Sequence, residues 1–234
     1  MELNKIHCCD CIEFITTLPD KCIDLIVTDP PYKFKLGGHK GFYKNKKWNN
    51  IKKIEDSFGH DFNPDPILTA SIRIMKIYNA YFWTSKSLVP DYLNFAIKNK
   101  FAFNILTWHK TNCPPLINNN FLPDTEYCIH MRAKGACFNS KLNNINLYHK
   151  YFITHANQFQ RESEHPCPKP LAIPSTHIQI SSKENDLIFD PFIGSGTTAV
   201  ACRGLNRNFI GCEINPEYCQ IAERRLSQEV MNLL

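Results

Sequence analysis

The sequence predicts a single α/β domain with a mostly parallel β-sheet flanked by helices. Short apolar runs bounded by turn residues, at Ile23 to Val27 and Ala80 to Thr84, have the length and composition of buried strands. A third run begins at Leu187 and leads through a glycine turn into a helix of small residues, Thr197 to Cys202. Strands that alternate with helices over 234 residues are typical of one domain of this class.

The remaining elements follow the same alternation. Further strands are predicted at Lys5 to Cys9, Phe101 to Trp108, Thr125 to Met131 (antiparallel, near the sheet edge) and Phe209 to Cys212. Further helices are predicted at Cys11 to Leu18, Pro66 to Lys76, Asp91 to Asn99, Leu171 to Ser181 and after the Asn215-Pro216 cap. In the last helix Ile221, Ala222 and Leu226 are expected to face the sheet, with Arg224 and Arg225 outside. Trp108-His109-Lys110 follows a strand end and could line the cleft, although a core Trp108 and a solvated Lys110 are the more common arrangement.

Composition favours a soluble, cytoplasmic protein. Hydrophobic residues make up 43% of the chain, and no uninterrupted apolar stretch approaches the roughly 18 residues of a membrane span. The 11 cysteines are an odd number, so reduced thiols packed in the core are favoured over disulfides. Cys8 and Cys11 form a Cys-x-x-Cys pair without a second pair of similar spacing, and no metal site is expected.

The four residues Asp29-Pro30-Pro31-Tyr32 stand where a buried strand ends, and ligands bind beyond the carboxyl ends of such strands. The Asp29 carboxylate and the Pro30 carbonyl are hydrogen-bond acceptors on a stiff backbone, suited to receive an NH₂ group. Tyr32 offers a π face on which a flipped-out base could stack. The alternative is a Pro-Pro turn that ends a strand, with Asp29 as a cap and Tyr32 half-buried.

The net positive charge of +5 comes from a stretch directly after this tetrapeptide, because the rest of the chain has more acidic than basic residues. Residues Lys33 to Lys53 contain eight lysines and no acid, and they are interleaved with aromatic residues and glycines. Such a loop suits a phosphate backbone and a displaced base, although a solvated loop without function would look similar.

A second motif extends from Leu187 to Glu213. The glycine turn Gly194-Ser195-Gly196-Thr197 follows Asp190-Pro191-Phe192, and Glu213 ends the next strand, 19 residues after Gly194. A carboxylate at that position can accept hydrogen bonds from both hydroxyls of a ribose. Taken alone, the glycine pattern also fits a nicotinamide-dinucleotide-dependent oxidoreductase, but such an enzyme leaves Asp29 to Tyr32 unexplained.

Together the two motifs resemble the S-adenosylmethionine-dependent DNA amino-methyltransferases that modify adenine N6 or cytosine N4. Their order, with Asp29-Pro30-Pro31-Tyr32 before the glycine turn, resembles the permuted β arrangement of that family. The resemblance implies the Rossmann-like class I methyltransferase fold, with about seven strands, and Asp29, Pro30, Pro31 and Tyr32 as catalytic residues. It implies cofactor contacts at Asp10, Cys11, Asp29, Lys169, Asp190, Phe192, Gly194, Ser195, Gly196, Thr197, Glu213 and Ile214.

Two positions depart from the family pattern. Cys9 stands where a glycine is usual before Asp10, and Cys167-Pro168 replaces Thr-Gln in the segment His165 to Pro170, which borders the methionine end of the cofactor. Lys169 in that segment is kept and is expected to be a carboxylate partner. The polar stretch from Phe138 to Glu164 lies where the family has its variable target-recognition region.

The sequence therefore predicts methyl transfer from S-adenosylmethionine to a flipped base in double-stranded DNA, most simply adenine N6, by a bacterial or phage-encoded enzyme. Adenine N6 is favoured over the alternative, cytosine N4, because the cytosine enzymes more often have serine at the position of Asp29. A DNA-binding regulator that has lost activity is disfavoured, since Asp29, the glycines and Glu213 are all present. The recognition sequence, a homodimer and a cognate restriction endonuclease are left open.

Overall fold

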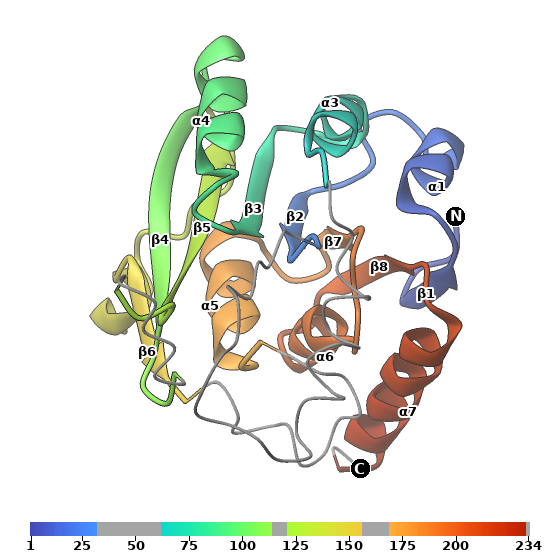
Figure 1. Cartoon of the computed structure of the whole chain (residues 1–234). Coiled ribbons are helices and arrows are strands. Elements are labelled where there is room, and N and C mark those ends of the chain that lie inside the picture. Colours follow the sequence, from blue (N-terminus) through green and yellow to red (C-terminus); the bar gives the residue numbers. More distant parts are fainter. Residues whose placement is uncertain (32–61, 114–120, 156–168, 233–234) are drawn as a thin grey trace, which may run out of the picture.

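A mixed β-sheet forms the middle layer of the protein, whose computed structural model describes residues 1–31, 62–113, 121–155 and 169–232. Within these residues the sheet has the strand order β1-β8-β7-β2-β3-β5-β4-β6 (Figure 1). The strands are β1 (Lys5–Cys8), β2 (Leu25–Thr28), β3 (Asn79–Thr84), β4 (Ala102–Lys110), β5 (Thr125–Arg132), β6 (Tyr151–Thr154), β7 (Leu187–Asp190) and β8 (Asn208–Glu213). All pairings are parallel except those of β5 with β3 and β4.

The predicted α/β class is confirmed, and the described sheet has eight strands where about seven were expected. The extra strand is β6, which pairs in parallel with β4 and lies within the stretch Phe138 to Glu164, where no strand was predicted. Its four residues, Tyr-Phe-Ile-Thr, favour a strand, but the segment is too short to stand out among the polar residues around it. The 3₁₀ turn Ile145–Tyr148 precedes it.

Helices cover both faces of the sheet. They are α1 (Cys11–Thr17), α3 (Asp65–Ile74), α4 (Val89–Lys98), α5 (Ala172–Ser181), α6 (Thr197–Gly204) and α7 (Pro216–Asn232). One face is covered by α1, α3 and α4, and the other by α5, α6 and α7 (Figure 1). Strands β2 and β3 are buried along their whole length between these layers, which explains their continuous apolar runs.

The expectation that the cysteines pack in the core is confirmed for five of them. Cys11, Cys128, Cys202, Cys212 and Cys219 are buried, whereas Cys8 is exposed and Cys9, Cys22, Cys113 and Cys137 are partly exposed. Trp108 is also buried. Within the described residues, no helix combines the length and apolar character that crossing a membrane requires.

Local sequence explains how the helices near the strand ends begin. Asp10 caps α1, because its Oδ1 accepts hydrogen bonds from the backbone amides of Ile12 at 2.8 Å and Glu13 at 3.0 Å. Asn215 caps α7 in the same way, with Pro216 as the first helical residue. Gly196 precedes α6 with φ 83°, a left-handed conformation that glycine adopts at little cost.

Candidate active site

Four carboxylates lie at consecutive strand ends on one edge of the sheet. Asp10 follows β1, Glu213 ends β8, Asp190 ends β7 and Asp29 follows β2, and these strands are neighbours in the order β1-β8-β7-β2. The chain order scatters these residues over the whole sequence. The parallel sheet brings them to a single edge, where ligands bind in this architecture.

Asp29 presents one occupied and one unoccupied oxygen. Its Oδ2 accepts a hydrogen bond from Lys169 Nζ at 2.6 Å, whereas its buried Oδ1 has no hydrogen-bond partner among the described residues. Burial raises the pKa of Asp29, and the single ammonium of Lys169 does not fully offset that effect. Pro30 is buried and Pro31 is partly exposed. Tyr32 and the basic stretch Lys33 to Lys53 lie outside the described residues.

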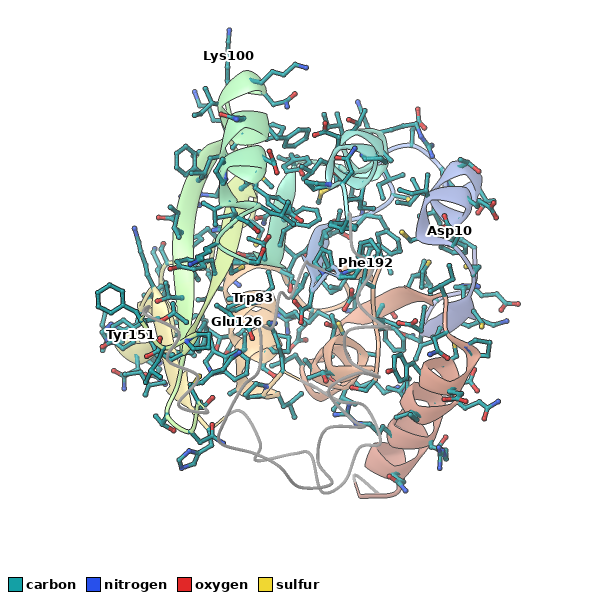
Figure 2. All side chains as sticks on the ribbon, in the orientation of Figure 1. Asp10, Trp83, Lys100, Glu126, Tyr151 and Phe192 are labelled. Carbon is teal, nitrogen blue, oxygen red and sulfur yellow. The ribbon has the colours of Figure 1, made fainter. Side chains whose placement is uncertain are left out.

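Lys169 is the centre of a chain of buried charges that the sequence did not reveal. Its Nζ also bonds Glu126 Oε2 at 2.8 Å, and Glu126 Oε1 pairs with Lys110. The ammonium of Lys169 lies 4.9 Å from the ring centre of Trp83 and 5.7 Å from that of Trp108. Figure 2 labels Trp83 and Glu126, which come from β3 and β5. The order of charges is therefore Asp29, Lys169, Glu126, Lys110, with alternating signs.

The surroundings of Glu126 fix its charge. Burial by itself raises the pKa of Glu126, but the ammonium groups of Lys169 and Lys110 outweigh burial and hold the pKa at about 2. Burial likewise opposes the charge on Lys169, yet its two carboxylate partners raise the pKa of the ammonium above its usual value. Of the two alternatives for Lys110, the solvated one is wrong, because its side chain is only 18% exposed and is paired with Glu126.

Asp190 links the turn after β7 to the neighbouring strand β2 through hydrogen bonds. Its Oδ1 accepts hydrogen bonds from Thr28 Oγ1 at 2.6 Å and from the Phe192 amide at 3.1 Å. Burial raises the pKa of Asp190 to about 6, although these donors act in the opposite direction. The ring of Phe192, labelled in Figure 2, packs edge-on against Phe62 with ring centres 5.6 Å apart.

The glycine turn is held from two sides. Gly194 has φ 52°, and its amide donates to Glu213 Oε2 at 3.0 Å, while Glu213 Oε1 accepts from the Asn215 amide at 2.8 Å. At Gly196 an added Cβ would lie 2.9 Å from the Cβ of Ala222 on α7, so the turn also touches that helix.

The prediction that Arg225 points outward is wrong. Its Nη1 bonds the Ser195 carbonyl at 2.6 Å, Ser195 Oγ at 2.8 Å and Thr197 Oγ1 at 3.3 Å, whereas Arg224 is exposed as expected. Helical spacing identified the buried stripe of α7, which Ile221, Ala222 and Leu226 do form. It could not show that a long side chain at the border of that stripe reaches back to the turn.

The other predicted cofactor residues border the same edge. Asp10 caps α1 and Cys11 is buried in its first turn, while Ile214 is 70% exposed directly after Glu213. Sequence reasoning missed Glu126 altogether and did not predict the pairing of Lys110 with it. The available signal was an acidic residue near the start of β5, which becomes informative only when the antiparallel direction of that strand is known.

Comparison with known proteins agrees with this arrangement. Residues 23–224 match the N6/N4 DNA methylase family. The chain is 31% identical to the type II methyltransferase M2.DpnII of Streptococcus pneumoniae, over 94% of this chain and 88% of that protein. It is 30% identical to M2.LlaDCHI of Lactococcus lactis subsp. cremoris, over 94% and 87% respectively.

Solved structures show the same likeness. The complex of M1.HpyAVI with S-adenosylmethionine superposes with a TM-score of 0.69 at 27% identity, covering 95% of this chain and 98% of that one. The cytosine-N4-specific PvuII DNA methyltransferase shares the fold, with a TM-score of 0.72 at 15% identity over 94% of this chain and 85% of that one. With these matches and the carboxylates at the strand ends, the chain belongs to the family of S-adenosylmethionine-dependent DNA amino-methyltransferases.

Proposed function

We propose that the protein transfers a methyl group from S-adenosylmethionine to N6 of an adenine flipped out of double-stranded DNA, within a short specific sequence. The observation that carries the proposal is the buried Oδ1 of Asp29, an acceptor without a partner among the described residues at the carboxyl end of β2. A buried acceptor of this kind costs stability unless a ligand satisfies it. An aspartate at this position, rather than serine, favours adenine by its resemblance to the N6 enzymes.

Asp29 and Pro30 would activate the amine. The Asp29 carboxylate and the Pro30 carbonyl each accept one hydrogen of the NH₂ group, which draws the nitrogen toward tetrahedral geometry and frees its lone pair. Lys169 holds Oδ2 of Asp29 at 2.6 Å and leaves Oδ1 for this contact. Pro31 stiffens the turn, and Tyr32 would stack on the flipped base.

The chain's residues fit S-adenosylmethionine. Glu213 at the end of β8 would take the ribose hydroxyls, since each of its oxygens accepts one amide hydrogen bond and retains a second acceptor site. Asp10 would contact the adenine amine of the cofactor, and Phe192 would pack on it. When bound, the cofactor supplies an electrophilic methyl group on a sulfonium. Catalysis by the protein is then mainly positioning and electrostatics.

The wider cofactor set and the DNA contacts are part of the same proposal. Gly194, Ser195, Gly196 and Thr197 would give the cofactor a close backbone surface, with Cys11, Asp190 and Ile214 beside it. Lys169 as a partner of the cofactor's own carboxylate stays a prediction. The stretches Lys33 to Lys53 and Phe138 to Glu164 would hold phosphates and read bases.

Transfer of a labelled methyl group to DNA tests the proposal directly. After incubation with labelled S-adenosylmethionine, the DNA is digested to nucleosides and the labelled product is identified by mass spectrometry. Labelled N6-methyldeoxyadenosine is expected. Labelled N4-methyldeoxycytidine would mean that the target base is cytosine and not adenine. DNA without label would refute methyl transfer to DNA.

Asp29→Ala is the matching variant. Because the carboxylate is expected to act on the target amine, methyl transfer should be abolished while S-adenosylmethionine affinity stays within roughly tenfold, about 1.4 kcal/mol. Calorimetry measures the affinity, and the labelled transfer measures activity. Retained turnover, or lost cofactor binding, would refute the role of Asp29.

A further inference from the structure

We propose that Glu126 is a positioning residue of methyl transfer: with Lys110 it holds Lys169 so that the ammonium covers only Oδ2 of Asp29 and leaves Oδ1 for the target amine. The proposal rests on the proposed role of Asp29. Glu126 does not touch the target base in this scheme, and it acts through Lys169.

The topology of the sheet places Glu126 at this edge. Strand β5 is antiparallel to both of its neighbours, so its beginning lies at the edge where β3 and β4 end. Glu126 is the second residue of β5, and its register partner is Trp108 near the end of β4. Lys110, the last residue of β4, is thereby placed beside it.

These charged side chains are largely enclosed, so each needs its partner to remain charged. The side chains of Lys169, Glu126 and Lys110 are 9%, 16% and 18% exposed. A charge so enclosed is stable only when paired and hydrogen-bonded. Glu126 gives one oxygen to each lysine, and Lys169 gives its ammonium to one oxygen of Glu126 and one of Asp29. The electrostatic attraction of Glu126 for the Lys169 ammonium therefore competes with that of Asp29.

Removing the charge of Glu126 and removing the charge of Lys110 should shift Lys169 in opposite directions relative to Asp29. Without the negative charge of Glu126, Lys169 is free to turn fully to Asp29 and compete for Oδ1. Without Lys110, the carboxylate of Glu126 loses one of its two ammonium partners and draws Lys169 away from Asp29. The negative charge of Glu126 raises the proton affinity of Asp29, whereas the positive charge of Lys110 lowers it.

Other titratable groups near Asp29 also interact with it electrostatically. Among the described residues they are Lys169, Glu126, Lys110, Asp190, Tyr92 and Cys128. Only the first three form the chain of ion pairs, and the remaining groups are unchanged in the variants below.

The test is the single-turnover rate of methyl transfer to DNA, measured against pH with saturating S-adenosylmethionine. Glu126→Gln keeps the shape of the side chain and removes its charge. The rate should fall about 10- to 100-fold through misplacement of the acceptor, with cofactor affinity within roughly threefold. The acid limb, where the rate falls because Asp29 is protonated, should move by roughly one pH unit to lower pH.

Lys110→Met should shift the acid limb of the pH–rate profile in the opposite direction. It should move the acid limb to higher pH, because a positive charge that lowers the pKa of Asp29 is lost. Loss of packing alone cannot produce opposite shifts in two variants of one ion-pair chain. If Glu126→Gln does not fold, the shift in Lys110→Met alone decides the proposal.

Asp24→Asn is the matched control. Asp24 is a similarly enclosed carboxylate, 19% exposed and paired with Lys76 at 2.8 Å, but it precedes β2 at the opposite edge of the sheet. Its rate and pH profile should equal those of the unmodified protein. An unchanged rate and profile in Glu126→Gln, or a shift to higher pH in it, would overturn the role of Glu126. Activity in Asp29→Ala would instead overturn the proposed function.

Discussion

The carboxylates of Asp29 and Glu126 share one ammonium, yet their surroundings give them different chemistry. Glu126 has a lysine at each oxygen, and its pKa is held at about 2, so it stays ionised at every physiological pH. Asp29 has a lysine at one oxygen, and burial raises its pKa. The residue type is therefore a poor guide to function at this edge, and the number of partners decides which oxygen remains available for a ligand.

Glu213 gives a prediction at the same scale. Its proposed contacts to the ribose hydroxyls should contribute about 2 to 3 kcal/mol, because buried hydroxyls left unpaired are costly. Glu213→Ala should therefore weaken S-adenosylmethionine binding by roughly 30- to 150-fold in a calorimetric titration. Glu217→Ala removes the same charge from an exposed position four residues later and should leave affinity unchanged. Equal affinities in the two variants would mean that the glycine turn has been misread.

At the scale of elements, the glycine turn depends on α7 as much as on the strand before it. Arg225 reaches from α7 to Ser195 and Thr197, and Ala222 leaves no room for a side chain at Gly196. The last helix of the chain thus fixes a turn that begins about 30 residues earlier. Close approach of the two elements holds the backbone of Gly194 to Thr197, the turn proposed to contact the cofactor, in one conformation.

Replacing Gly196 with alanine tests this close approach. The residue combines φ 83° with a Cβ position 2.9 Å from Ala222 Cβ, so strain and overpacking add to a loss of about 2 to 4 kcal/mol in the free energy of unfolding. Gly135→Ala is the control, because Gly135 has φ 88° and open space around it. It should lose only about 1 to 2 kcal/mol. Denaturant unfolding measures both, and equal losses would contradict a tight contact between the glycine turn and α7.

For the whole molecule, charge is distributed unevenly along the chain. The net charge is +5, and the eight lysines between Lys33 and Lys53 follow directly after the proposed catalytic residues. This placement favours a phosphate contact beside the strand edge that carries Asp29. Exposed lysines at the opposite edge, at or just after the ends of α4, β5 and α5, belong to the same net charge but would lie away from DNA.

Salt dependence distinguishes these two groups of lysines. Replacing Lys44, Lys46 and Lys47 with alanine should flatten the slope of log DNA affinity against log salt by up to about three units, without changing cofactor affinity or sequence preference. The control replaces Lys98, Lys134 and Lys183, all exposed at the opposite edge, and should leave the slope unchanged. A changed sequence preference would mean that the stretch reads bases, and an unchanged slope would mean that it is only solvated surface.

The sequence by itself determined the α/β class, most of the strands and helices, and the two motifs at the ends of β2 and β7. These features are local: apolar runs, helix caps such as Asp10 and Asn215, and a glycine turn all act over a few residues. Among the strands of the described residues, β6 alone was missed, because four residues at a sheet edge carry little periodicity.

The tertiary structure alone decided which charged residues meet. Lys169 lies 140 residues from Asp29 and 43 from Glu126, and no local pattern links them. Their meeting depends on strand order and on the antiparallel direction of β5, which brings the start of one strand to the ends of its neighbours. For the same reason the inward reach of Arg225 was not predictable: helical spacing fixes the direction of the Cα–Cβ bond, whereas the partner of a long side chain is set by what packs beside the helix.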